Sequence, residues 1–139
     1  MRSKPRKRKV RVPTYASLKN RLDRVFSVWT RRRFADQSGM VRCVSCGATK
    51  HWKQIQAGHF QKRHYLGTRW HPENVAPQCV ACNVFGSGNL AAYAAWGVNR
   101  YGQDWPARMV SLSKETVKWS RTDLQQLIED YETRLRHLG

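Results

Sequence analysis

All four cysteines of this chain occur in two Cys-x-x-Cys pairs, a spacing at which both thiolates of a pair can bind one metal ion. The pairs are Cys43/Cys46 and Cys79/Cys82. Together they can complete a tetrahedral shell of four sulfurs, which zinc most often occupies and which leaves no position open for a reacting water. An iron–sulfur cluster is compatible with the same ligands, and a redox-active dithiol is the third alternative. We predict a structural Zn²⁺ that joins the two ends of the segment 41–83.

One histidine and two asparagines lie between and beside these cysteine pairs. His59 occurs in "QAGHF", Asn74 lies five residues before Cys79, and Asn83 directly follows Cys82. A neutral imidazole is an effective general base near pH 7, and an amide oxygen suits a hard divalent cation. A single histidine is more often structural than catalytic. The order of a strand with His, a strand and loop with Asn, and a helix that opens with a polar ligand nevertheless predicts a ββα-metal core.

The segment resembles a known group of nucleases. It is similar to the zinc-containing HNH nucleases in a His–Asn–Asn version (His59, Asn74, Asn83), including phage endonuclease VII, in which four cysteines also flank the catalytic histidine. The strings "QAGHF", "TRW", "PENVAPQC" and "GN" more closely resemble the NinG (Rap) family of lambdoid-phage recombination endonucleases. This resemblance covers about residues 40–137 and includes the "TDLQQLIEDYETRL" segment.

The resemblance implies an activity and a role for each residue. It implies a metal-dependent endonuclease that hydrolyses phosphodiesters in branched DNA, such as Holliday junctions and D-loops. His59 would activate the attacking water, Asn74 would orient the hairpin that carries His59, and Asn83 would bind a catalytic Mg²⁺ or Mn²⁺. Symmetric cleavage of a four-way junction needs two active sites, so we expect a homodimer that uses the terminal helices.

One position departs from the HNH pattern. Many HNH enzymes have a metal-binding aspartate directly before the base, where this chain has Gly58. The replacement ligand could be a backbone carbonyl, a water, or the side chain of His64, His71 or Glu73. We therefore expect a weaker catalytic ion site that Mn²⁺ supports better than Mg²⁺. Gly58 also favours an alternative function, a non-catalytic zinc-containing DNA-binding or architectural module.

The charge of the chain indicates a polyanionic partner. Lys and Arg number 26 against 9 Asp and Glu, a formal net charge of +17. We predict DNA contacts by the N-terminal arm and by basic residues near His59, although ordinary basic surface is the alternative for each. The candidate contacts are Arg2, Lys4, Arg6, Lys7, Arg8, Lys9, Lys62, Arg63 and Arg69. The charge also permits an RNA-binding role, which the His–Asn–Asn placement does not support. Three tryptophans, Trp52, Trp70 and Trp96, are core or base-stacking candidates.

The elements that must position these residues predict an α+β fold, with a ββα-metal core flanked by N- and C-terminal helices. We expect a disordered basic arm over 1–13 and one domain over 14–139, made of a helix at 14–38, the core at 41–100 and a helical part at 101–139. Leu18, Leu22 and Phe26 begin the apolar stripe of the first helix. Thr122 and Gln125 have capping-box spacing before the last helix, whose apolar stripe is core or a dimer contact.

No stretch of 18 apolar residues is present, and no apolar segment follows the basic N-terminus as in a secretory signal. We therefore predict no membrane association. The expected location is the cytoplasm, of the host cell if the chain is a phage protein. In that reducing compartment, paired cysteines indicate metal binding rather than disulfides.

Overall fold

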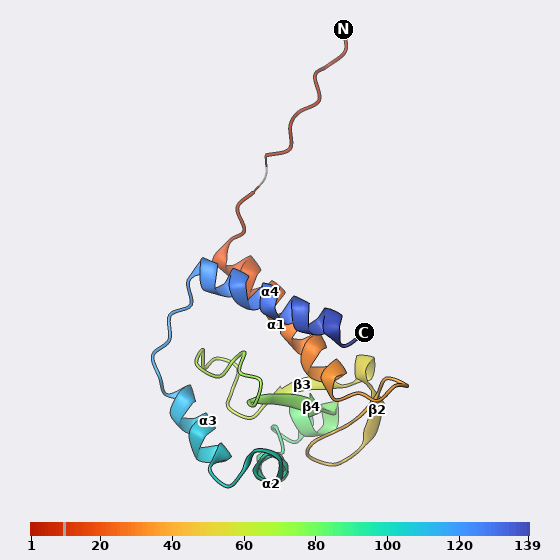
Figure 1. Ribbon diagram of the computed structural model, residues 1–139, viewed down its shortest axis with the longest axis vertical. Coiled ribbons are helices and arrows are strands. Elements are labelled where there is room, and N and C mark those ends of the chain that lie inside the picture. Colours follow the sequence, from red (N-terminus) through yellow and green to blue (C-terminus); the bar gives the residue numbers. More distant parts are fainter. Residues whose placement is uncertain (10) are drawn as a thin grey trace.

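Two antiparallel strand pairs lie between a pair of terminal helices and a second pair of helices (Figure 1). This arrangement comes from a computed structural model that describes residues 1–9 and 11–139. The elements are α1 (Tyr15–Arg33), β1 (Met40–Arg42), β2 (Thr49–His51), the 3₁₀-helix η1 (Trp52–Gln54), β3 (Gln56–His59), β4 (Val75–Gln78), the π-helix η2 (Ala81–Phe85), α2 (Leu90–Tyr101), α3 (Trp105–Ser113) and α4 (Arg121–His137). The predicted mixture of helices and strands is confirmed.

The first helix ends earlier than the predicted 14–38. Thr14 caps its N-terminus, with Oγ1 accepting from the Ser17 N–H at 3.1 Å. After Arg33 the Asp36 carboxylate accepts from the N–H groups of Ser38 and Met40 at 2.9 and 3.0 Å. These two bonds stabilise a turn instead of a further helical turn, and the turn leads directly into β1.

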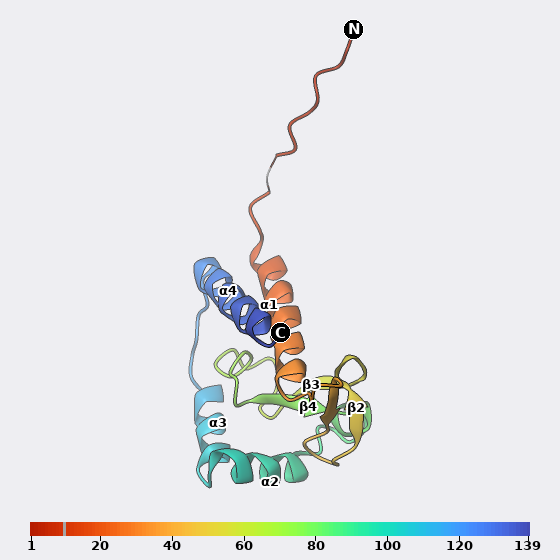
Figure 2. The same cartoon turned by 45° about the vertical axis from the view of Figure 1, so that its right-hand side comes forward.

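The terminal helices pack against each other within the chain (Figures 1 and 2). Arg21 of α1 and Glu132 of α4 form an ion pair of 2.7 Å across the outside of this contact. The shared core contains Leu22, Phe26 and Trp29 from α1 with Leu124, Ile128 and Tyr131 from α4. The apolar stripe of the last helix is therefore core, and the expected dimer contact through the terminal helices cannot use these faces.

The capping box of α4 lies two residues before the predicted one. Ser120 Oγ accepts from the Asp123 N–H at 3.0 Å, and the Asp123 carboxylate accepts from the Ser120 N–H at 2.9 Å. Thr122 and Gln125 have the same spacing, but a carboxylate is the stronger acceptor and also interacts favourably with the positive end of the helix dipole. The Ser120 hydrogen bonds accordingly lower the pKa of Asp123.

Strands β3 and β4 form the second antiparallel pair, with Gly58 opposite Ala76 and His59 opposite Val75. Every residue of β4 is buried. Helices α2 and α3 cover it through Tyr93 and Trp105, and the Tyr93 hydroxyl donates to the Gly58 carbonyl at 2.8 Å. Helix α3 was not predicted as a separate element.

The segment after Cys79 is helical, and the helix is interrupted at residues 86–89. One turn of π-helix, η2, precedes the interruption and α2 follows it. Ser87, Gly88 and Asn89 have positive φ angles, which turn the chain sharply between these helices.

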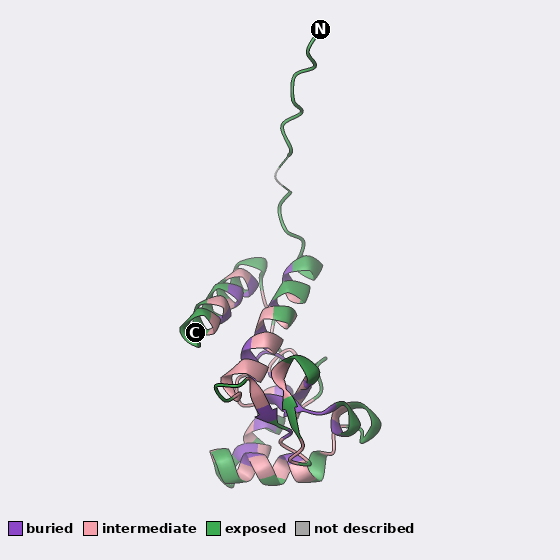
Figure 3. Ribbon diagram, turned by 90° about the vertical axis from the view of Figure 1, so that its right-hand side faces the viewer, coloured by how far each residue is buried: buried purple, intermediate pink, exposed green. Residues whose placement is uncertain are grey.

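The N-terminal arm extends away from the folded body and is exposed throughout its described part (Figure 3). Residues 1–9 and 11–13 have no helix or strand, and Val10 of the predicted arm lies outside the described residues. Within residues 1–9 and 11–139, no helix has both the length and the apolar composition needed to cross a membrane.

Candidate functional site

The four cysteines converge on one point. Their Sγ atoms all lie within 4.8 Å of one another, and the Sγ atoms of Cys46 and Cys79 are 3.6 Å apart. A tetrahedral zinc site with Zn–S bonds of about 2.3 Å has sulfurs about 3.8 Å apart, so this cluster could hold a zinc ion. Cys43 and Cys46 lie in the turn after β1, whereas Cys79 and Cys82 lie after β4 and in η2.

The surroundings of the cluster favour a cation. Burial would raise the pKa of Cys43, but the backbone N–H groups of Cys46, Cys79 and Ser45 point toward its sulfur and lower that pKa to about 7. At Cys82, a hydrogen bond from Asn89 would lower the pKa, but burial and the neighbouring thiols raise it to about 12. A bound cation would favour the thiolate form of these cysteines.

The cluster also fixes the turn that follows β4. The Asn83 N–H donates to the Cys79 carbonyl, and the Gly88 N–H donates to the Cys82 carbonyl, both at 2.9 Å. The Asn89 side chain donates to the Cys82 sulfur at 3.5 Å. Bonds between the four sulfurs and one ion would therefore also fix the positions of Asn83 and the turn 86–89.

A pocket of about 420 Å³ opens beside this turn. His59 of β3 and Asn83 of η2 both line it, together with Lys62 and Arg63. Its other lining residues are Asp23, Phe26, Ser27, Ala57, Phe60, Ser87, Gly88 and Leu90. The pocket is thus formed by α1, the end of β3, and the segment that the cysteine cluster holds.

The imidazole of His59 has a defined orientation. Its Nε2 lies 2.9 Å from the Arg69 carbonyl oxygen, which can only accept, so Nε2 carries the proton and Nδ1 keeps a free lone pair. Burial lowers the pKa of His59, and the opposing hydrogen bond to Arg69 offsets only part of this effect. His59 is therefore neutral near pH 7 and can accept a proton at Nδ1.

Asn74 is fully buried and holds the loop between β3 and β4. Its Oδ1 accepts from the Gln61 N–H at 2.8 Å, and its Nδ2 donates to the carbonyls of Gln61 and Thr68 at 3.1 Å. Asn74 does not line the pocket. Its contacts are those expected of a residue that orients the strand pair.

Arg69 has a different environment from the one predicted for a phosphate contact. It is buried, and its guanidinium donates to both carboxylate oxygens of Asp23, at 3.1 and 2.6 Å. Because this charge is already paired, a phosphate-binding role does not fit Arg69 in this structure. Lys62 and Arg63 are exposed at the pocket, as a phosphate contact requires.

Sequence reasoning missed Asp23, the carboxylate of the pocket. Burial would raise its pKa, but hydrogen bonds from Arg69 and Trp70 and the charge of Arg69 outweigh that effect and lower it. Asp23 holds the side chain of Arg69, and the backbone of Arg69 in turn binds His59. The available signal was that Asp23 is the one acidic residue in an otherwise basic helix.

The side chain of Gln78 fills the space beside Gly58. Its Nε2 donates to Ser45 Oγ at 2.9 Å and to the Gly88 carbonyl at 2.6 Å. A Cβ atom on residue 58 would overlap Gln78 Oε1. The aspartate of the HNH pattern therefore cannot be accommodated at this position unless Gln78 moves.

The proposed replacements for that aspartate lie elsewhere. His64 is exposed and packs against Tyr65 at 4.0 Å between ring centroids. His71 Nδ1 accepts from the Glu73 N–H at 3.1 Å, and Glu73 forms an ion pair of 2.9 Å with Arg108. His64, His71 and Glu73 are not among the described residues that line the pocket.

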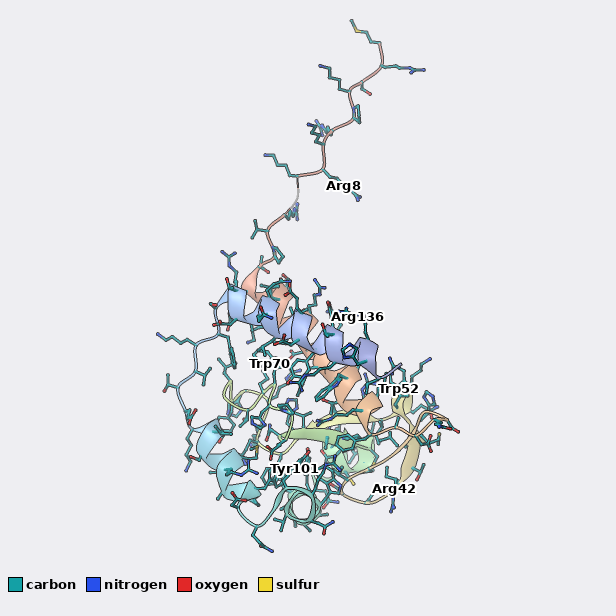
Figure 4. The ribbon with its side chains drawn as sticks, viewed as in Figure 1. Arg8, Arg42, Trp52, Trp70, Tyr101 and Arg136 are labelled. Atoms are coloured by element: carbon teal, nitrogen blue, oxygen red, sulfur yellow. The ribbon has the colours of Figure 1, made fainter. Side chains whose placement is uncertain are left out.

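The tryptophans divide between the core and the surface. Trp70 is buried between α4 and the loop before β4, and its Nε1 donates to Asp23 at 2.9 Å (Figure 4). Trp96 is half-buried against Tyr93 and Phe34. Trp52 is half-buried at the edge of the molecule, with the Arg31 guanidinium 5.5 Å from its ring (Figure 4). Trp70 is therefore a core residue, whereas Trp52 and Trp96 are both only half-buried.

The cysteine cluster gives a prediction about stability. Replacing Cys79 with Ser removes a sulfur from the centre of the cluster, so we expect loss of bound zinc and a substantially lower melting temperature, because the binding free energy of a structural metal contributes to folding. Zinc content by mass spectrometry of the native protein and thermal unfolding by circular dichroism measure these effects. Unchanged zinc content and unchanged melting in Cys79→Ser would contradict the assignment.

The contact between Gly58 and Gln78 gives a second prediction. We expect Gly58→Asp to destabilise the fold by about 1–3 kcal/mol, as overpacking of a close-packed site does. Adding Gln78→Ala should restore part of that loss, because it removes the overlapping atom. Gln37→Asp, at an exposed position in the turn after α1, is the control. If the changes in unfolding free energy for Gly58→Asp and Gln78→Ala, measured with denaturant, simply add in the double variant, the overlap is not the cause.

Comparison with known proteins identifies the family. The model of the family described as "Bacteriophage Lambda NinG protein" matches residues 1–139. The NinG proteins of Escherichia phage 933W and Escherichia phage lambda are 31% and 30% identical over 97 residues, which is 69% of this chain and 47% of each relative. The chain thus spans about half the length of these curated relatives.

The NinG protein of Salmonella phage P22 is also 30% identical over 97 residues, with the same coverage of both chains. No solved structure matches the chain significantly. Because the family model covers every residue, including the arm and both terminal helices, the chain belongs to the bacteriophage lambda NinG family.

Proposed function

We propose that this protein is a metal-dependent endonuclease that hydrolyses branched DNA, with His59 as the general base. The observation that carries the proposal is that His59 and Asn83, from two segments of the chain, line one pocket beside exposed Lys62 and Arg63. The resemblance to HNH nucleases gives the same two residues as the base and the ion ligand. The preference for junctions and D-loops rests on the resemblance to NinG proteins.

The geometry of His59 suits proton transfer. Nδ1 would accept the proton of a water as its oxygen attacks the phosphorus, and Nε2–H would stay bonded to the Arg69 carbonyl. This carbonyl also stabilises the imidazolium that forms. Asp23 contributes by holding Arg69, so it acts as a positioning residue for the base.

The oxygen ligand in the pocket suits a metal ion whose other ligands are waters and DNA phosphates. Asn83 Nδ2 donates to Gln56 Oε1 at 2.8 Å, and no hydrogen bond to Asn83 Oδ1 occurs among the described residues. Mg²⁺ in nucleic-acid enzymes commonly takes one or two protein oxygens, with waters and substrate phosphates completing its shell. A bound Mg²⁺ or Mn²⁺ would supply positive charge for the phosphate and the leaving oxygen. With one amide ligand and no carboxylate at Gly58, ion affinity should be low without DNA.

Phosphate binding would come from several basic segments. Lys62 and Arg63 flank the pocket, and the described part of the arm adds exposed Lys and Arg residues that can follow a DNA backbone. Arg31 and Arg33 of α1 contribute less, because they donate to the carbonyls of Trp52 and Val75. A homodimer would supply two pockets for a four-way junction, through a surface other than the packed faces of α1 and α4.

One observation favours the second candidate, a non-catalytic DNA-binding module. Gln78 closes the position that holds a metal-binding aspartate in many HNH enzymes. A binding module would need the cysteine cluster and the basic surface but not a free Nδ1 on His59. The two functions therefore differ in what happens when His59 is removed.

The test is cleavage of a four-way junction with Mg²⁺, Mn²⁺ or a chelator. We expect His59→Ala to lower the cleavage rate by about 10²–10⁴-fold, because the general base is lost, while junction affinity is retained. His64→Ala is the matched control, since His64 is exposed and lies outside the pocket. Cleavage by His59→Ala at the unaltered rate would eliminate His59 as the base. No cleavage by the native protein with either ion would favour the binding module.

The buried position of His59 predicts the pH dependence. Burial lowers its pKa below the ordinary 6.5, so the neutral form persists at pH values where an exposed histidine is protonated. We expect the acid limb of kcat/KM for cleavage to have its midpoint below pH 6.5. An acid limb centred above 6.5 would show that another group is the base.

A further inference from the structure

Three exposed apolar side chains lie on the segment that forms one wall of the pocket. Val84, Phe85 and Leu90, here called the apolar rim, are 55%, 83% and 46% exposed. Leu90 itself lines the pocket, and Asn83 and Ser87 on either side of Val84 and Phe85 line it too. A protein of net charge +17 thus places its most exposed phenylalanine next to its candidate catalytic residues.

The apolar rim is held outward by a rigid turn. The Gly86 N–H donates to the Ala81 carbonyl at 2.7 Å, and the Ser87 N–H donates to the Val84 carbonyl at 3.3 Å. Gln78, from the buried strand β4, donates to the Gly88 carbonyl. The positive φ angles at Ser87 and Asn89 and the attachment to Cys82 complete this support. These bonds hold the backbone directly after Phe85, and the Phe85 side chain is exposed.

We propose that Phe85 stacks on a base exposed at a DNA branch point and thereby makes the protein selective for branched over linear DNA. This inference rests on the proposed function, because it assigns the substrate feature that the same pocket recognises. The exposed aromatic face gives stacking energy with any base, and a base in a continuous duplex is already stacked on its neighbours. Bases at a branch are cheaper to unstack, so the same contact is worth more there.

The charge around the apolar rim selects nucleic acid as the occupant. Lys62 and Arg63 lie at the same pocket, and among the described residues no acidic side chain besides Asp23 lines it. Asp23 is already paired with Arg69. An exposed aromatic ring on the segment that forms the wall of a pocket with basic side chains matches a base flanked by its phosphates. A second copy of this chain would bring the same positive charges into contact.

The experiment uses the full-length protein in a His59→Ala background, so that binding is measured without cleavage. The probes are a four-way junction with 2-aminopurine at the branch and a linear duplex with 2-aminopurine at its centre. Without a change at Phe85, we expect the junction signal to rise on binding, because 2-aminopurine fluoresces more strongly when it is drawn away from the neighbouring bases that quench it. Phe85→Ala should abolish that rise and weaken junction affinity by about tenfold, while duplex affinity is unchanged.

Two variants and one further measurement make the result interpretable. Phe85→Trp should keep both the signal and the affinity, since it keeps an aromatic face. Val110→Ala, which truncates an exposed valine of α3 away from the pocket, should change neither. Thermal unfolding checks that the fold of each variant is intact, which we expect because the Phe85 side chain is exposed.

The outcomes separate this inference from the proposed function. Equal loss of junction and duplex affinity in Phe85→Ala, or an unchanged 2-aminopurine signal, would overturn the role of Phe85. A smaller molecular mass for Phe85→Ala without DNA, measured by light scattering, would overturn it as well, because Phe85 would then join two copies. The expected junction signal, together with a native protein that never cuts the junction with either ion, would support the stacking role while refuting the nuclease.

Discussion

The arrangement of the site depends on the convergence of four cysteine sulfurs. Cys43 and Cys46 follow the first strand, and Cys79 and Cys82 follow the last, so one bound ion would join the two ends of the central segment. The π-helical turn that contains Cys82 also contains Asn83. Because that turn has few apolar contacts of its own, its position depends on the sulfurs and on the hydrogen bonds they organise. A structural ion would in this way position a residue of the adjacent pocket.

A second set of contacts positions His59 from the opposite side. The first helix supplies Asp23, which binds the guanidinium of Arg69, and the Arg69 carbonyl then fixes the imidazole. Trp70 donates to the same carboxylate and packs in the core between α1 and α4. The terminal helices are therefore part of the site's construction, although they lie far from it in sequence. Their packing determines which nitrogen of His59 is free.

The relation between Gly58 and Gln78 shows what a position without a side chain does for this fold. A glycine at position 58 leaves room for the Gln78 amide, which ties the turn at Ser45 to the turn at Gly88. The space that a side chain at position 58 would occupy is thus used to support the pocket wall. A site built in this way offers an ion few protein ligands, so binding would depend on oxygens from the substrate.

Local patterns in the sequence determined the cysteine cluster, the mixture of helices and strands, the cap at Thr14 and the apolar stripes of the terminal helices. Such features depend on residues a few positions apart, whose spacing reflects the geometry of one turn, strand or helix. Where two sequence patterns predicted the same feature, the folded structure decided between them. Ser120 rather than Thr122 caps α4, because its partner Asp123 forms the stronger hydrogen bond. The pairing of Asp23 with Arg69, which removes Arg69 from the phosphate contacts and orients His59, was decided only by the tertiary structure. Those residues are brought together by helix packing across 46 positions of the chain, and no short-range spacing encodes that contact.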